Sequence, residues 1–146
     1  MQDKLKSIID YGNTKEGKQI QLAMLYFGEG TKNRKRGCLT IGNSDPQLIK
    51  HFLHLLRTCY MLDESKFRCT VQCRADQNSD LLTIFWSEQT NIPLTQFYKT
   101  QVDKRTIGKP TKKLNYKGVC RIDYFNSNIF HEMISCYQIL SQGPVA

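Results

Sequence analysis

The stretch QLAMLYFGEGTK, residues 21–32, reads as the last turns of a helix that closes on an acid between two glycines. Apolar and small residues recur at spacings of three and four, as on one face of a helix, at Ile20, Ala23, Met24, Phe27 and Gly28. Gly30 is placed to end that helix. Glu29 then faces the negative end of the helix dipole, where an isolated carboxylate costs a few tenths to about 1 kcal/mol. A bound cation would reverse that sign, so Glu29 is either a metal ligand or a solvent-exposed helix end.

Outward from this helix, helical and strand patterns alternate along the chain. We expect a short helix at 2–10, strands at 37–42, 67–74 and 118–125, and further helices that begin at Ser44-Asp45-Pro46, Ser79-Asp80 and Ser127. In the strand FRCTVQCR, residues 67–74, apolar side chains point one way and polar or basic ones the other. The order of elements predicts an α/β or α+β chain.

Composition limits the class of protein. A chain of 146 residues with 40% hydrophobic residues is expected to form one folded domain over 1–146. It has neither an apolar run long enough to cross a membrane nor the layout of a signal peptide, so we expect an intracellular, non-secreted protein. The cysteines are then expected to be reduced, and they mostly lie within apolar segments: Cys38, Cys59, Cys69, Cys73, Cys120 and Cys136. Their spacing does not favour structural zinc.

The charge points to an anionic partner. Lys and Arg number 21 against 13 acids, which gives a net charge of +8, and nucleic acid is the commonest partner of such a chain. Two basic segments, 32–36 and 99–117, flank strands whose outward faces carry Arg, Thr and Gln, the residue types that read base edges in the major groove. The alternative is a solvated sheet face with inert basic loops. The expected contacts with double-stranded DNA are Lys32, Arg34, Lys35, Arg36, Thr40, Arg68, Thr70, Gln72, Arg74, Lys104, Arg105, Lys109, Lys112, Lys113, Lys117 and Arg121.

A family resemblance lies in the opening stretch. LAMLYFGEG, residues 22–30, resembles the nine-residue motif of the LAGLIDADG homing endonuclease family, with matches at Leu22, Ala23, Leu25 and Gly30 and an acid, Glu29, before the final glycine. GCLTIGNSDPQLIKHFLHLL resembles the family's strand-then-helix passage, and IPLTQFYKT resembles a later segment in which a lysine approaches the active site. The resemblance extends over about residues 17–140.

The resemblance implies an α+β fold of LAGLIDADG type, in which a twisted antiparallel sheet forms a DNA-binding saddle backed by helices. The motif helix, about 17–30, would pack against its twin in a homodimer through Ala23, Phe27 and Gly28. Met24 and Phe27 stand where the family usually has glycine and aspartate, which implies a bulkier interface helix. The family builds four strands and the sequence shows three, so the fourth is expected just after Glu29.

The resemblance also implies an activity. It assigns catalysis to Glu29 and Lys99, and a site for Mg²⁺ or another divalent cation to Glu29 and Gly28. The expected function is sequence-specific cleavage of double-stranded DNA by phosphodiester hydrolysis in a homodimer. The alternative is a catalytically inactive DNA-binding regulator, because some relatives on this fold have lost cleavage. An RNA-binding module is less favoured, because few aromatic residues alternate with the basic ones.

Overall fold

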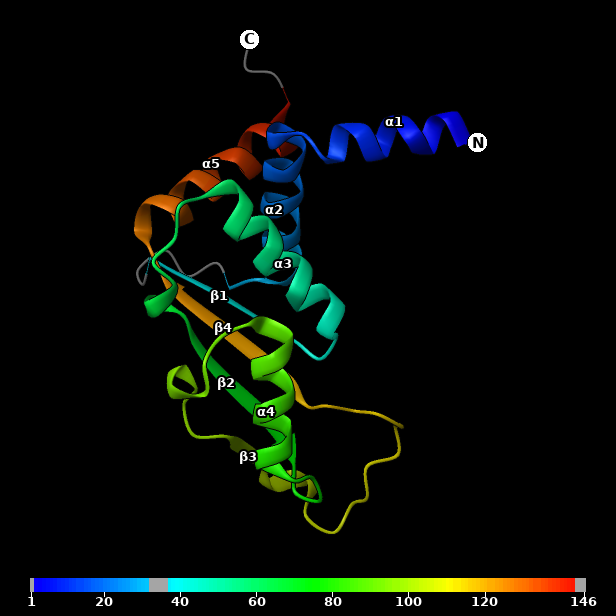
Figure 1. Ribbon diagram of the computed structural model, residues 1–146, viewed down its shortest axis with the longest axis vertical. Coiled ribbons are helices and arrows are strands. Elements are labelled where there is room, and N and C mark those ends of the chain that lie inside the picture. The colour runs from blue at the N-terminus through cyan, green and yellow to red at the C-terminus, as the bar shows by residue number, and fades with distance from the viewer. Residues whose placement is uncertain (1, 32–36, 144–146) are drawn as a thin grey trace.

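The computed structural model describes residues 2–31 and 37–143, and within them the chain is α+β (Figure 1). The helices are α1 (Gln2–Gly12), α2 (Lys15–Glu29), α3 (Pro46–Cys59), α4 (Ser79–Thr90) and α5 (Ser127–Gln142). The strands are β1 (Cys38–Asn43), β2 (Arg68–Arg74), β3 (Gln101–Asp103) and β4 (Val119–Phe125). The helices and strands expected from the periodicity are confirmed, and β3 is an addition to them.

The sheet has the order β1-β4-β2-β3, with β4 antiparallel to both of its neighbours and β3 parallel to β2. The sheet is therefore mixed, and the expectation of a wholly antiparallel sheet is wrong at this edge. Among the described residues, the fourth strand is β3, which lies inside the basic stretch 99–117. In the described part of the segment after Glu29, Gly30 forms only an isolated bridge to Ile41, and the Thr31 N–H donates to the Thr40 carbonyl at 2.7 Å.

The helices cover one face of the sheet, and the core lies between them and that face. In Figure 1, α3 and α4 lie on the same side of the strands, while α2 and α5 pack beside each other above β1. Alternate strand residues point into this layer, among them Ile41, Val71 and Ile122, all nearly inaccessible to solvent. Phe67, Cys69, Cys73, Cys120 and Tyr124 are buried as the alternation predicted.

Side chains that cap the helices fix where they begin. Asp45 caps α3 by accepting a hydrogen bond from the Gln47 N–H at 2.9 Å, as expected. For α4 the cap is Asn78, which accepts from Leu81, and for α5 it is Asn126, which accepts from Ile129. The helices begin at Ser79 and Ser127, as expected, but the capping side chain of α4 is Asn78 and not Ser79 or Asp80.

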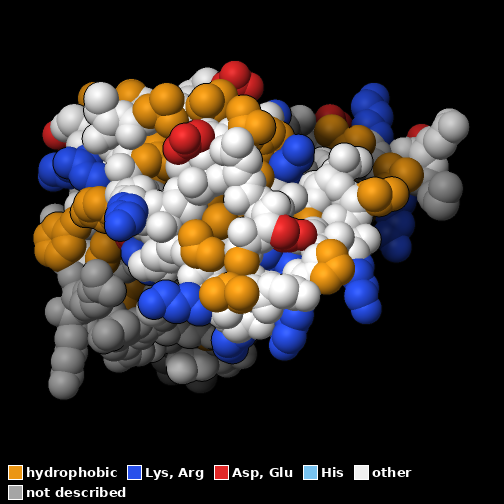
Figure 2. Space-filling model, turned by 90° about the horizontal axis from the view of Figure 1, so that it is seen from below, with side chains coloured by type: hydrophobic (Ala, Val, Ile, Leu, Met, Phe, Trp, Pro, Cys, Tyr) orange, Lys and Arg blue, Asp and Glu red, His pale blue; other side chains and the backbone are white. Residues whose placement is uncertain are grey.

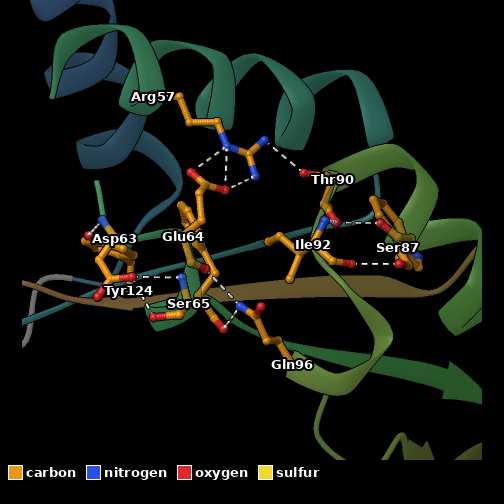
Figure 3. A network of polar contacts seen from close by, with 11 residues as sticks. Arg57, Asp63, Glu64, Ser65, Ser87, Thr90, Ile92, Gln96 and Tyr124 are labelled. Atoms are coloured by element: carbon orange, nitrogen blue, oxygen red, sulfur yellow. Dashed lines mark hydrogen bonds and ion pairs between the residues drawn. The ribbon is translucent and has the colours of Figure 1, made fainter. Parts of the chain in front are cut away.

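A polar network ties α3 to the segments around β2 (Figure 3). The Arg57 guanidinium pairs with Glu64 at 2.8 Å and also donates to the Thr90 carbonyl at 2.9 Å. The Gln96 amide donates to the carbonyls of Glu64 and Phe67, both at 2.9 Å. These bonds join α3 to the end of α4 and to the segment before β2.

The first helix stands apart from the rest of the fold. α1 projects from the body in Figure 1 and has no buried residue. All six cysteines are free, and burial raises the pKa of Cys73 while a neighbouring Cys69 thiol and burial raise that of Cys120. Among residues 2–31 and 37–143, no helix is long and apolar enough to cross a membrane.

Candidate nucleic-acid interface

Within the described residues, no α-helix covers the second face of the sheet, whose side chains follow from strand alternation. Residues that alternate with the core positions point to this side, here called the open face. It comprises Cys38, Thr40 and Gly42 of β1, Arg68, Thr70, Gln72 and Arg74 of β2, Gln101 and Asp103 of β3, and Val119, Arg121, Asp123 and Phe125 of β4. The strand residues expected to contact DNA all lie on it.

Glu29 lies beside the open face. A hollow of about 300 Å³ is lined by Glu29, Thr31, Thr40, Gly42, Thr70, Gln72, Gln101, Val119 and Arg121. The end of α2 and all four strands thus contribute to one concavity. The structure brings the helix-terminal acid together with Thr40, Thr70, Gln72 and Arg121, which were expected to contact DNA.

The position of Glu29 depends on the residues around it. Its side chain is exposed, and its Oε2 accepts a hydrogen bond from the Asn43 Nδ2 at 3.0 Å. Gly30 ends the helix, but with extended backbone angles (φ −88°, ψ 168°) and not in the left-handed region. A Cβ on Gly30 would lie 2.4 Å from the Tyr26 ring, so close approach is the reason for glycine here.

Tyr26 fastens the end of α2 to the sheet. Its hydroxyl donates to the Thr31 carbonyl and accepts from the Thr40 N–H at 3.2 Å. Burial raises the pKa of the Tyr26 phenol, which therefore stays neutral and can donate. Glu29, three residues on, is held at a fixed place beside β1.

Arg121 is the centre of a hydrogen-bonded group on the open face. Its Nε contacts Asp123 Oδ2 at 3.2 Å, and its Nη2 donates to Thr70 Oγ1 at 3.3 Å. Asp123 Oδ1 in turn accepts from Thr40 Oγ1 at 2.8 Å. Thr70 is only 3% exposed, because Arg121 lies over it, so a duplex would meet Arg121 and Gln72 before Thr70.

A second hollow of about 360 Å³ continues the open face. It is lined by Cys38, Lys66, Arg68, Tyr98, Arg121, Asp123 and Phe125. Arg68 donates to the carbonyls of Ser65 and Phe67, both at 2.7 Å, so its guanidinium is turned back toward its own strand. Lys66 and Tyr98 were not expected at this surface. Both lie outside the strands, so strand alternation could not predict their position at this surface.

The cations of the 99–117 stretch lie at the end of the molecule seen in Figure 2, where more Lys and Arg than acidic side chains are in view. Lys104, Lys109, Lys112 and Lys113 are exposed. Arg105 is exposed and pairs with Asp103 at 2.9 Å, and Lys117 is half-buried over the Phe85 ring. Lys32, Arg34, Lys35 and Arg36 lie outside the described residues.

Lys99 is exposed at the edge of the sheet. It lies between Phe97, which bridges to Cys69, and β3. It does not line the hollow that contains Glu29. The structure therefore does not bring these two expected catalytic residues into one concavity.

The residues expected at a dimer interface differ in exposure. Ala23 is completely buried within the chain and presents no surface to a partner. Phe27 is half-buried and stacks on Tyr137, with ring centroids 3.9 Å apart. Gly28 is exposed, and Met24 on the preceding turn is 48% exposed. The outer side of α2 is thus formed by Gly28 and Met24.

Within residues 2–31 and 37–143, no three His, Cys, Asp or Glu side chains gather as a metal-binding group. A divalent cation at Glu29 would need further oxygen donors beside this carboxylate, such as backbone carbonyls, water or a phosphate. No protein-family model matches the chain, and the searches of curated proteins and of solved structures found no match.

Proposed function

We propose that the open face binds double-stranded DNA and that two copies of the chain together act as a divalent-metal-dependent endonuclease. The observation that carries this proposal is the hollow of about 300 Å³ in which Glu29 lies beside Thr40, Gln72 and Arg121. An acid that could hold a metal thus adjoins side chains that could contact a duplex.

The binding half of the proposal rests on charge and geometry. A net charge of +8 favours a polyanion. Arg and Gln at alternate positions of neighbouring strands can read guanine and adenine in the major groove, while loop lysines neutralise phosphates and set the register. A DNA partner also accords with an intracellular location, in which free cysteines persist.

The catalytic half rests on Glu29. A carboxylate is a hard oxygen ligand, and bound Mg²⁺ would activate water and stabilise the leaving oxygen. Each chain supplies one Glu29, and an isologous dimer would place two such acids about a two-fold axis and recognise a roughly palindromic site. Gly28 and Met24 on the outer side of α2 are the surface through which we propose that the copies meet.

A catalytically inactive DNA-binding regulator is the second candidate. It is favoured by the hydrogen bond from Asn43 to Glu29, which gives the carboxylate a partner within the chain at 3.0 Å. A Glu29 held in this way also serves as a structural residue. Both candidates use the open face, and they differ in what divalent metal adds.

The experiment begins with selection of bound sequences from random duplex DNA. The selected duplex is then incubated with the protein with Mg²⁺ and with a chelator. We expect cleavage with Mg²⁺ only. Glu29→Gln should abolish cleavage and keep binding, because it removes the charge and leaves the shape. Glu88→Gln, which changes an exposed acid on α4, is the matched control and should cut like the unaltered protein.

Binding without cleavage under any divalent ion would establish the regulator. Cleavage that survives Glu29→Gln would remove Glu29 from the mechanism. A chain that remains monomeric on the selected duplex would contradict the two-fold arrangement.

A further inference from the structure

The loop between β3 and β4 is fastened to the turn that follows β2. The Arg74 guanidinium donates to Thr111 Oγ1 at 3.1 Å and to the Lys109 carbonyl at 2.9 Å. The Gln77 amide donates to the Tyr116 carbonyl at 2.6 Å. A segment whose lysines suggest a mobile loop is therefore held at several points along its length.

Asp76 makes two further attachments to the loop, both to Thr111. One of its oxygens accepts from the Thr111 N–H at 2.7 Å and the other from Thr111 Oγ1 at 2.6 Å. These two bonds lower the pKa of Asp76, so the carboxylate is charged at neutral pH. Lys112 and Lys113 follow Thr111 directly, so this attachment fixes the backbone from which both lysines extend.

The fastened loop borders a hollow of about 630 Å³. Its lining is Arg74, Gly108, Lys109, Pro110, Thr111, Lys112, Lys113 and Tyr116. The lining contains four cations and no acid. Arg74 belongs both to this hollow and to the open face, so the two surfaces are continuous.

We propose that this hollow binds phosphates of a DNA backbone beside the open face, and that Asp76 is a positioning residue that holds Lys112 and Lys113 toward them. The proposal rests on the proposed DNA-binding function and adds a site at which the phosphate backbone of the duplex binds. Three exposed lysines at fixed positions meet phosphates with less loss of conformational freedom than three lysines on an unattached loop.

The sign of one substitution distinguishes this role from a simple charge effect. Asp76 is an acid beside a cationic hollow, so its removal would strengthen binding to a polyanion if only charge mattered. If Asp76 positions the loop, its removal weakens binding although the net charge becomes more positive.

The test measures affinity for a random-sequence 40-base-pair duplex over a range of salt concentrations. We expect Asp76→Ala to weaken binding roughly tenfold near 0.1 M salt, and to reduce the slope of log K against log salt by about 2, the loss of two phosphate contacts. Thr111→Val removes the hydroxyl bonds without a change in charge and should act in the same direction. Asp80→Ala, which removes an exposed acid four residues away, is the control and should bind as tightly as the unaltered protein or slightly more tightly.

A second set of variants links Asp76 to the lysines. With Lys112→Ala and Lys113→Ala already present, Asp76→Ala should change the affinity less than twofold, because the cations it positions are gone. An equal loss in both backgrounds would show general damage and overturn the positioning role. Thr111→Val keeps the test valid if Asp76→Ala lowers the urea midpoint.

The outcomes separate the two proposals. Failure of the unaltered protein to bind the duplex at any salt concentration would overturn the DNA-binding function itself, and binding with a salt slope near zero would overturn the phosphate contacts of the hollow. Normal salt-dependent binding with Asp76→Ala as tight or tighter would overturn only the role of Asp76. Tighter binding of a 40-base-pair RNA duplex would overturn the assignment of the hollow to DNA.

Discussion

The two faces of β4 have the same two-residue spacing along the sequence but differ in burial and polarity. Cys120, Ile122 and Tyr124 point into the core and are nearly inaccessible to solvent. Arg121 and Asp123, which alternate with them, lie on the open face and bond to each other. One strand thus holds a face that specifies the fold and a face that is available to a partner.

The difference indicates that the two faces of β4 affect different measured quantities, the stability of the fold and the binding of a partner. Burial on the core face contributes to the free energy of unfolding, because removed atoms leave a cavity. On the open face the polar side chains satisfy one another at the surface, where such bonds contribute little to stability. A substitution on the core face of β4 should therefore change the free energy of unfolding, whereas one on the open face should mainly change the affinity for a partner.

The largest expected effect is on the core face. Ile122→Ala should lower the free energy of unfolding by about 2–5 kcal/mol, because Ile122 is 1% exposed and its neighbours cannot close the space. Urea denaturation followed by far-UV circular dichroism measures it. A loss below about 1 kcal/mol would show that this face is not tightly packed.

Tyr124→Phe tests the polar rim of the same face. The Tyr124 hydroxyl accepts a hydrogen bond from the Asp63 N–H at 2.9 Å, and this bond joins β4 to the segment drawn in Figure 3. Its loss should lower the free energy of unfolding by about 0.5–1.5 kcal/mol. The same denaturation series measures it, and an unchanged midpoint would show that water replaces the hydroxyl without cost.

Gly28→Ala compares the two sides of α2. A Cβ on Gly28 would meet no atom within 4 Å, so alanine fits the single chain and should raise its free energy of unfolding by about 0.5 kcal/mol. Urea denaturation at low protein concentration measures it, so that an association of copies does not contribute. Destabilisation at that concentration would show that glycine is needed within the chain itself.

On the open face, too, the expected change in stability is small. Arg121→Ala should alter the free energy of unfolding by less than about 1 kcal/mol, because its ion pair with Asp123 is partly exposed. The same variant should weaken duplex binding and reduce the salt slope by about 0.9 if Arg121 contacts one phosphate. Gln89→Ala on α4 is a control that should change neither quantity.

Local patterns predicted most of the elements. The alternation in 67–74 and 118–125 identified both strands and the face that each one buries, because a half-buried strand repeats every two residues. The starts of α4 at Ser79 and of α5 at Ser127 were also predicted, but the residues that cap these helices were not. Asn78 and Asn126 cap as well as serine does, and the sequence offers adjacent capping residues between which only the backbone path decides.

What the sequence did not predict depends on contacts between distant residues. β3 has three residues and no alternation long enough to recognise, and it exists through its pairing with Gln72, Cys73 and Arg74. Asp76 was not predicted at the candidate site, because its partner Thr111 is 35 residues away. Thr70 was predicted on the correct face, but its cover by Arg121 follows only from the sheet register.

The central place of β4 in the sheet has a consequence for synthesis of the chain. Among the described strands, β1 pairs only with β4, and Ile41 lies opposite Ile122. At about 5–20 residues per second, translation delivers β4 several seconds after β1. During that time the nascent chain carries two apolar strands with no partner between them, so a chain that stops before Val119 would expose their edges to other chains. The sheet can therefore close only after β4 has been synthesised.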